Sequence, residues 1–558
     1  MQEREKAYLL EKKAIQERDL LKKTSLFLNA SKIYNMIDDP IKTRHCKAEY
    51  YLYLGDYNSH QNKFKEARYF YSKAEKFFKE NSDRKGAFFA RSKYCKSYRF
   101  ESKVQGIDYM EYTKSIKNFL EEYSDFSDNF YYIEHKLNYY INKTLLYAKS
   151  ENYFMASEFA RKTSEYADMA YKAYPKDWIK KRKLINEAFL WEYKSKMENE
   201  NYIKKAKFLL NAAMAWEKVG NLRNAKYNYA NYYSSEGMSY LSKREYYTAM
   251  EYFKKSKQLF EELGISDSVF YALSYYYQTY SYAIKSGSIN DYEKFFTSVE
   301  DYLNSYKQYS DNDLYSQVMI SYYMTKSKWY RQKEDYENAL KNANACIEYV
   351  EAIKKQNPNS GVGERPKGAT SNHDRVIATN KAIYWNIKAK QLKETTKNFL
   401  EIADAYKKSA QYQKEVDEDM YYDACVNYYK YLAIANKYDR KVFIENIEKA
   451  IYYANKRSDD LQINYLMGLK YDHLASLAKE KEKTLEYLAH AKENYYKAGA
   501  KELGAYSERA YNEILKSQKL KEDTNTPKRS IRRSLSKATV LFENWFQKSI
   551  GKIIARKN

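Results

Sequence analysis

The stretch AEYYLYLGDYNSHQNKFKEARYFYSKAEKFF, residues 48–78, contains two amphipathic segments of helical periodicity. The two segments carry small and aromatic residues at fixed offsets, which are Tyr51, Leu54, Gly55, Ala67, Tyr71 and Ala74. Small residues allow two helices to approach closely, whereas large side chains at the same positions would push the helices apart. The stretch therefore predicts a closely packed helical hairpin.

This hairpin is one copy of a repeat. A polar residue, often Asp or Asn, followed by an aromatic residue marks each copy, at Phe64, Tyr109, Tyr153, Tyr202, Tyr246, Tyr292 and Tyr336. The gaps between these marker aromatics are 45, 44, 49, 44, 46 and 44 residues. Each period holds two amphipathic helices of about 18–20 residues. Because one hairpin cannot bury its own apolar face, neighbouring hairpins must stack into a solenoid.

The quoted hairpin resembles the tetratricopeptide repeat in its order of aromatic, Leu and Gly, followed by Ala, aromatic and Ala. A second copy matches the same pattern at Tyr233, Gly237, Tyr240, Ala249 and Phe253. The period departs from that family, whose repeats have about 34 residues. The resemblance implies an all-α, right-handed α-solenoid, and we expect about 11–12 antiparallel hairpins and a C-terminal amphipathic helix.

Composition supports a helical protein in a reducing compartment. The 558 residues exceed what one core holds, and only 14 Gly and 5 Pro leave little turn chemistry for a many-stranded fold. The four cysteines, Cys46, Cys95, Cys346 and Cys425, stand far apart, which predicts neither a zinc site nor a disulfide framework. The sequence has no apolar run long enough for a signal peptide or a membrane span, so we expect a cytoplasmic protein.

The repeat rhythm divides the chain into five parts. Residues 1–355 form the predicted N-terminal tetratricopeptide-like solenoid, and 356–374 form an exposed loop rich in Gly and Pro. Residues 375–520 form helical hairpins with a degraded repeat signature. Residues 521–534 are a polar and basic linker, and 535–558 are an amphipathic helix.

The sequence contains no recognisable catalytic, metal or cofactor site. None of the six histidines has a second His or Cys three or four residues away on the same helical face. Some tetratricopeptide domains hold a partner's C-terminal carboxylate with Lys and Asn at two fixed positions. In this chain those positions contain Leu52 and Asp56 in one copy and Met324 and Lys328 in another, so this carboxylate clamp is absent. We therefore expect neither an enzyme nor a cofactor.

Charge is concentrated at the C-terminal end. The net charge is +24, of which residues 528–558 contribute +8, so the rest of the chain is only mildly basic. Apolar residues of this tail recur at helical spacing beside the basic ones. The candidate partner or membrane contacts are Arg529, Arg532, Arg533, Phe542, Trp545, Phe546, Lys548, Ile550, Lys552 and Ile553. Three interpretations stay open for the tail helix: a cap on the last hairpin, a membrane-surface anchor, or an insert into a partner groove or against nucleic-acid phosphates.

These observations favour a non-enzymatic scaffold or adaptor that holds a protein partner along the concave groove of the solenoid. One alternative is a peripheral adaptor that binds the anionic inner membrane surface through the tail. The other alternative is a helical-repeat protein that binds nucleic acid.

Overall fold

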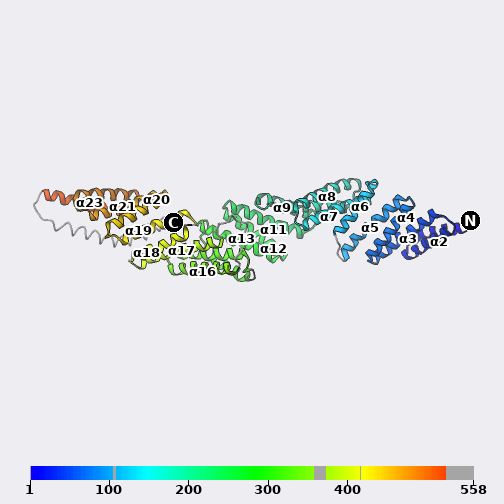
Figure 1. Cartoon of the computed structure of the whole chain (residues 1–558), viewed down its shortest axis with the longest axis horizontal. Coiled ribbons are helices and arrows are strands. Elements are labelled where there is room, and N and C mark those ends of the chain that lie inside the picture. The colour runs from blue at the N-terminus through cyan, green and yellow to red at the C-terminus, as the bar shows by residue number, and fades with distance from the viewer. Residues whose placement is uncertain (1, 105–108, 357–371, 397, 415, 523–558) are drawn as a thin grey trace. The chain divides into compact units, whose positions relative to one another are not determined.

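The computed structural model describes residues 2–104, 109–356, 372–396, 398–414 and 416–522. These residues form α-helices joined by short turns, and they contain no strand (Figure 1). Most of the predicted loop at 356–374 and all residues from 523 onward lie outside the described residues. The domain boundaries proposed there stay predictions.

The chain forms two compact units, Met1–Tyr276 and Tyr277–Asn558. The helices of the first unit are α1 (Gln2–Gln16), α2 (Leu20–Met36), α3 (Pro40–His60), α4 (Phe64–Glu80), α5 (Arg84–Val104), α6 (Tyr109–Glu122), α7 (Phe130–Lys149), α8 (Tyr153–Ala173), α9 (Asp177–Met197), α10 (Tyr202–Val219), α11 (Leu222–Ser242) and α12 (Tyr246–Leu263). Helix α13 (Ser266–Lys285) contains the boundary between the units.

The second unit continues the same pattern. Its further helices are α14 (Tyr292–Ser305), α15 (Asp313–Gln332), α16 (Tyr336–Gln356), α17 (Asn372–Thr395), α18 (Phe399–Gln413), α19 (Glu418–Ala435), α20 (Arg440–Lys456), α21 (Asp460–Leu477), α22 (Lys481–Lys497) and α23 (Lys501–Glu522). Short 3-10 turns, Ser124–Phe126 and Lys307–Tyr309, follow α6 and α14. Within the described ranges the 23 α-helices pair into 11 hairpins followed by α23, which confirms the predicted all-α hairpin array.

The marker aromatics are regularly spaced because each of them begins a helix. All seven are the first residue of a helix, because they open α4, α6, α8, α10, α12, α14 and α16. Several follow an N-cap side chain: Asn152, Asn201 and Asp291 accept hydrogen bonds from backbone N–H groups two or three positions into the helix. Such caps satisfy donors that have no partner inside the helix. Each repeat therefore begins its second helix at a cap followed by an aromatic ring.

The turns before these helices use few glycines. Asn62, Glu151, Arg244 and Glu334 instead adopt left-handed backbone conformations, with φ of 57°, 56°, 63° and 61°. A side chain larger than that of glycine destabilises this conformation by about 1 kcal/mol, and Asn tolerates it best. The array thus keeps its turns short although the chain has only 14 glycines.

Glu151→Gly is expected to stabilise the first unit by about 0.5–1 kcal/mol, because Glu151 is exposed and its left-handed conformation suits glycine. Asn62→Gly should give a smaller gain in the same type of turn. Hydrogen exchange of the amides in α7 and α8 measures the effect. A loss of stability in Glu151→Gly would contradict the reading of this turn.

The small residues of the repeat lie where the two helices of a hairpin touch. A Cβ atom on Gly55 would lie 2.6 Å from the Tyr71 ring, and one on Gly237 would lie 2.7 Å from the Phe253 ring. Ala67, Ala74, Ala249, Tyr71 and Phe253 are buried, whereas Tyr51, Leu54, Tyr233 and Tyr240 are half-buried. This glycine-against-ring packing is the tetratricopeptide-like arrangement that the sequence predicted.

Gly55→Ala is expected to destabilise the first unit by about 1–3 kcal/mol, because its methyl group would overlap the Tyr71 ring. The ring cannot move freely, since the Tyr71 hydroxyl donates a hydrogen bond to Asp56 at 2.8 Å. Gly504→Ala serves as the control, because its neighbour Tyr496 is an exposed side chain. Denaturant unfolding measures both variants, and equal effects would contradict this account of Gly55.

Candidate functional site

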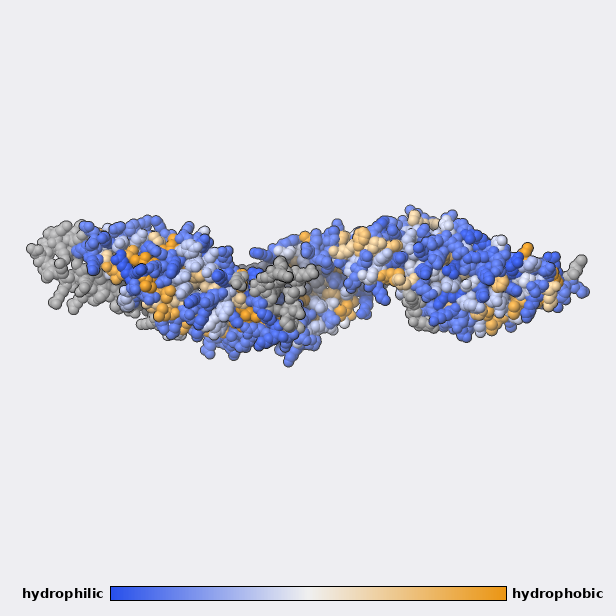
Figure 2. Space-filling view, viewed as in Figure 1, coloured by the Kyte–Doolittle hydropathy of each residue, from blue (hydrophilic) through white to orange (hydrophobic). Residues whose placement is uncertain are grey.

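The described part of the chain meets the requirements of neither a metal site nor a membrane span. Nowhere in it do three His, Cys, Asp or Glu side chains come together as metal ligands. No described helix combines the length and the apolar character needed to cross a membrane. The four cysteines are buried and free. The visible face in Figure 2 is mainly hydrophilic, and its hydrophobic residues form small separate groups.

One serine–histidine pair has the distance of a catalytic pair but not its surroundings. Ser92 Oγ lies 3.0 Å from His135 Nε2, and both residues are buried. Burial lowers the pKa of His135 to about 4, and its Nδ1 atom has no hydrogen-bond partner. A catalytic histidine needs an acceptor on that nitrogen to fix its orientation. We therefore assign Ser92 and His135 to the packing of α5 against α7.

A cavity of about 810 Å³ lies in the first unit, lined mainly by the first helices α3, α5 and α7 and in part by α2 and α4. Aromatic residues, including Phe89, Phe100 and Tyr131, and the charged residues Asp56 and Lys93 line it. The cations on this face have acidic partners. Lys93 Nζ lies 2.6 Å from Asp56 Oδ2.

The neighbouring cations of this first unit are paired in the same way. Glu134 accepts a hydrogen bond from Arg99, and Lys96 Nζ lies 3.6 Å from it. Arg68 Nη1 lies 2.7 Å from Glu101 Oε2, and both side chains are only 11% exposed. Most of these cations are therefore paired inside the unit, whereas Arg182 of α9 donates to the neutral Asn138 Oδ1 at 2.9 Å.

The corresponding face of the second unit is different. Six cationic side chains follow one another along α13, α15, α17 and α19, each within the last six residues of its helix. We call this set the cationic row; it consists of Lys285, Lys328, Arg331, Lys390, Lys393 and Lys430.

The residues of the cationic row form no ion pair with any described residue. The hydrogen bonds of Lys328 and Lys430 go to neutral acceptors, the backbone oxygen of Lys285 at 3.1 Å and Asn427 Oδ1 at 2.9 Å. The nearby carboxylate of Asp423 lies instead 2.8 Å from Arg457 Nη1. The row thus consists of cations that form no ion pair in the described chain, although the more distant carboxylates of Asp423 and Glu394 partly offset the charge of Lys390, Lys393 and Lys430.

Burial and mutual repulsion disfavour the charged state of the row. Burial lowers the pKa of Lys285, Lys390 and Lys393 to about 8 each. Burial also lowers the pKa of Lys328 and Lys430. The next cation along the row adds to the effect: Arg331 lowers the pKa of both Lys328 and Lys390. A bound anion would relieve both penalties, since it supplies an opposite charge to groups already removed from water.

Two tyrosine rings hold the middle of the row in place. The ammonium groups of Lys393 and Lys430 each lie 5.0 Å from the centroid of the Tyr431 ring. Tyr431 stacks on Tyr406 with centroids 5.7 Å apart, and both rings are only 2% exposed. These cation–π contacts fix the lysine ends without neutralising them.

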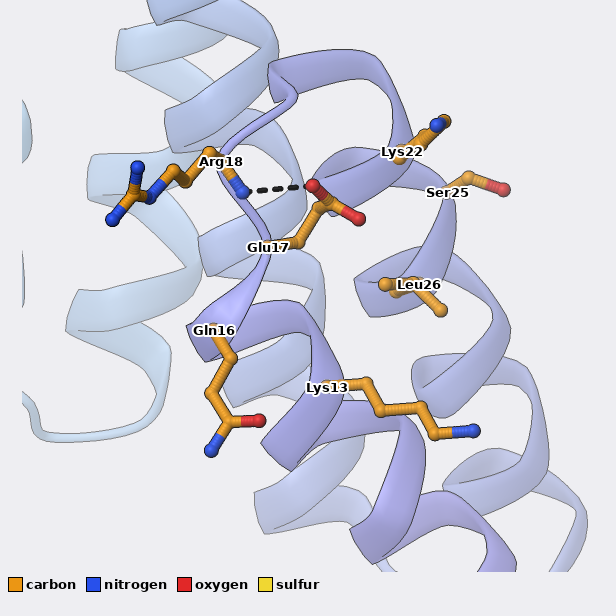
Figure 3. A pocket seen from close by; sticks show the side chains of 7 residues that line it. All are labelled: Lys13, Gln16, Glu17, Arg18, Lys22, Ser25 and Leu26. Atoms are coloured by element: carbon orange, nitrogen blue, oxygen red, sulfur yellow. Dashed lines mark hydrogen bonds between the residues drawn. The ribbon is translucent and has the colours of Figure 1, made fainter.

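A second cavity, of about 700 Å³, lies beside the turn between α1 and α2 (Figure 3). The Glu17 carboxylate in its wall accepts hydrogen bonds from the backbone N–H groups of Asp19 and Arg18, and these bonds lower the pKa of Glu17. The Arg18 guanidinium points away from the other labelled side chains. This carboxylate caps the turn, and the cavity holds no convergent set of functional groups.

The sequence-predicted contacts do not include the cationic row. Those contacts, Arg529, Arg532, Arg533, Phe542, Trp545, Phe546, Lys548, Ile550, Lys552 and Ile553, lie outside the described residues. The row was not predicted from the sequence, because its members are spread from residue 285 to residue 430. One signal was available: Lys328 stands eight residues before the marker Tyr336, as Asp56 stands eight before Phe64. The first unit also has a base at this position, Lys194, eight residues before Tyr202, so the position varies between acid and base along the chain.

Comparisons with known proteins add little beyond the fold. No protein-family model matches the sequence, and no curated protein sequence matches it significantly. Similar solved structures include a Rap protein complexed with competence and sporulation factor, with 12% identity, 68% of this chain and 98% of that chain covered, and a TM-score of 0.27. The Cut9–Hcn1 hetero-tetramer of APC/C is 11% identical over 90% of this chain and 96% of that chain, with a TM-score of 0.25. A circular tandem repeat protein is 11% identical over 90% of this chain and 98% of that chain, with a TM-score of 0.14.

Proposed function

We propose that this chain is a non-enzymatic interaction scaffold that binds a protein partner along the first helices of its second unit. The observation that carries this proposal is the cationic row. Unpaired cations that are partly removed from water destabilise a fold, and stability alone would not select them. Their retention on neighbouring helices is explained if a partner supplies the missing negative charge.

The hairpin array suits such a role. Stacked repeats present successive helices as one extended surface, so a long partner segment can contact several repeats at once. The cations of the row come from four helices of this kind, α13, α15, α17 and α19. No described residues form a catalytic set that would favour an enzyme instead.

Site-specific photo-cross-linking tests the proposal. A photo-reactive amino acid replaces Glu394, which is exposed on α17 next to Lys393, or Lys407, which is exposed on α18. In extracts of the native source, we expect a discrete protein adduct from position 394 and none from position 407. The partner is then identified, purified and titrated against wild type and the variant K390E/K393E.

The expected result is at least a tenfold loss of affinity for the purified partner in K390E/K393E. The matched control K341E/K407E changes two exposed lysines on the second helices α16 and α18, and it should bind like wild type. Absence of any adduct specific to position 394, or equal affinity in all three proteins, would refute the scaffold role of this face.

A further inference from the structure

We propose that the cationic row is a docking site for an extended acidic polypeptide segment that carries a carboxylate at about every third residue. This inference rests on the proposed scaffold function and names the chemistry of the partner. The row has six cations, of which Lys430 is buried, and none of them forms an ion pair with a described residue, so an anionic ligand would complement its charge.

The spacing of carboxylates follows from the packing of the helices. Direct contacts join neighbouring first helices: Ser281 Oγ lies 3.0 Å from Thr325 Oγ1, and Lys328 donates a hydrogen bond to the backbone of Lys285. Helices in such contact have axes about 8–10 Å apart. An extended chain advances about 3.3–3.6 Å per residue, so it passes one helix in about three residues. A carboxylate at each step would meet the next part of the row.

Part of the first unit pairs the cations of its first helices internally. At the position of Lys328 the first unit has Asp56, which pairs with Lys93 at 2.6 Å. Glu134 likewise neutralises Arg99 within that unit. The repeat therefore accommodates paired charges, and the second unit differs in having six cations without an ion pair on successive first helices.

A helix-capping role does not explain the row. A lysine near a helix C-terminus often donates hydrogen bonds to the last carbonyl groups. Lys328 makes a bond of this kind to a neighbouring helix, but Lys390 and Lys393 donate no hydrogen bond to a described residue. These two lysines remain partly exposed, which a ligand requires.

The surroundings favour a polypeptide over single-stranded nucleic acid. Proteins that bind single strands stack bases on exposed aromatic faces. The rings beside the middle of the row, Tyr406 and Tyr431, are only 2% exposed and stack on each other, whereas Tyr282, beside Lys285, is exposed. The chain's own tail is also unsuited, because residues 528–558 carry a net charge of +8 and would be repelled by the row.

Fluorescence anisotropy with the full chain tests this site. The probe is a labelled 18-residue peptide with Glu at every third position and Ser or Thr between; its Gln counterpart is the neutral control, and a 20-nucleotide poly-U strand is the competing ligand class. We expect the Glu peptide to bind, the Gln peptide to bind at least tenfold more weakly, and affinity to fall with added salt. Poly-U should bind more weakly than the Glu peptide.

The variants decide whether the binding belongs to the row. K390E/K393E and the uncharged K390Q/K393Q should both lose at least tenfold in affinity, whereas K341E/K407E should not. Circular dichroism confirms that each variant is folded. The inference is overturned if the Glu peptide does not bind, if K390Q/K393Q binds it like wild type, or if poly-U binds more tightly and loses that binding in K390Q/K393Q. A partner adduct at position 394 together with any of these results would leave the scaffold function standing without the acidic-segment site.

Discussion

The double variant K390M/K393M is expected to be more stable than the wild-type chain, by about 2–3 kcal/mol for the second unit at pH 7. Burial lowers the pKa of each of these lysines from the ordinary value of 10.5 to about 8. Each unit of pKa corresponds to about 1.4 kcal/mol, and partial exposure reduces the full effect. Methionine keeps the length of the side chain and removes the charge.

The gain in stability should depend on pH in a defined direction. Between pH 8 and 10.5 the unfolded chain binds more protons at these two positions than the folded chain, so the wild type becomes more stable as the pH rises. Below pH 8 the penalty is complete. Burial sets most of this penalty, Arg331 and Lys393 add to it at Lys390, and the carboxylates of Asp423 and Glu394 oppose it. The advantage of K390M/K393M should therefore be largest at pH 7 and shrink toward pH 10.

Hydrogen exchange of the amides in α17–α20 measures this local stability without requiring the whole array to unfold in one step. The control K341M/K407M should change it by less than about 0.5 kcal/mol, because exposed lysines contribute little. The stabilised variant should also lose the binding of the Glu peptide. A decrease in stability in K390M/K393M would show that the lysines support the fold, and it would remove the main argument for a binding role.

The repeat was predictable from the sequence because it depends on local chemistry. A polar cap followed by an aromatic, such as Asn152 followed by Tyr153, fixes a helix start wherever it occurs. The contact of Gly55 with Tyr71 was predictable for a similar reason, since both residues lie within one hairpin. Contacts between residues that are close in the sequence can therefore be predicted from the sequence alone.

The cationic row was not predictable in that way because pairing is decided between repeats. Lys93 and Lys393 both lie in the first helix of a hairpin among other basic residues, and the sequence around them does not show which of them is paired. Only the folded chain shows that Lys93 meets Asp56, which is 37 residues away in sequence, at 2.6 Å. The net charge of the solenoid does not distinguish the two units, because lysines with and without an ion pair contribute equally to it.

Glu134→Gln is expected to destabilise the first unit by about 2–4 kcal/mol, since it breaks a buried charge network while preserving the shape of the side chain. The Glu134 side chain is 9% exposed and accepts a hydrogen bond from Arg99. Burial alone would raise the pKa of Glu134, but the positive charges of Lys96 and Arg99 outweigh it and hold the pKa below its ordinary value. The carboxylate therefore stabilises the unit at neutral pH, and that contribution is lost as the pH falls through its lowered pKa.

The double variant R99M/E134Q identifies the cause of this loss. If the Arg99 charge that Glu134 balances in the wild type is responsible, removing that charge as well should restore at least half of the stability measured by hydrogen exchange in α5 and α7. A Glu134→Gln protein with wild-type stability would contradict the contrast between paired and unpaired faces. It would also weaken the inference that a missing acid marks a docking surface.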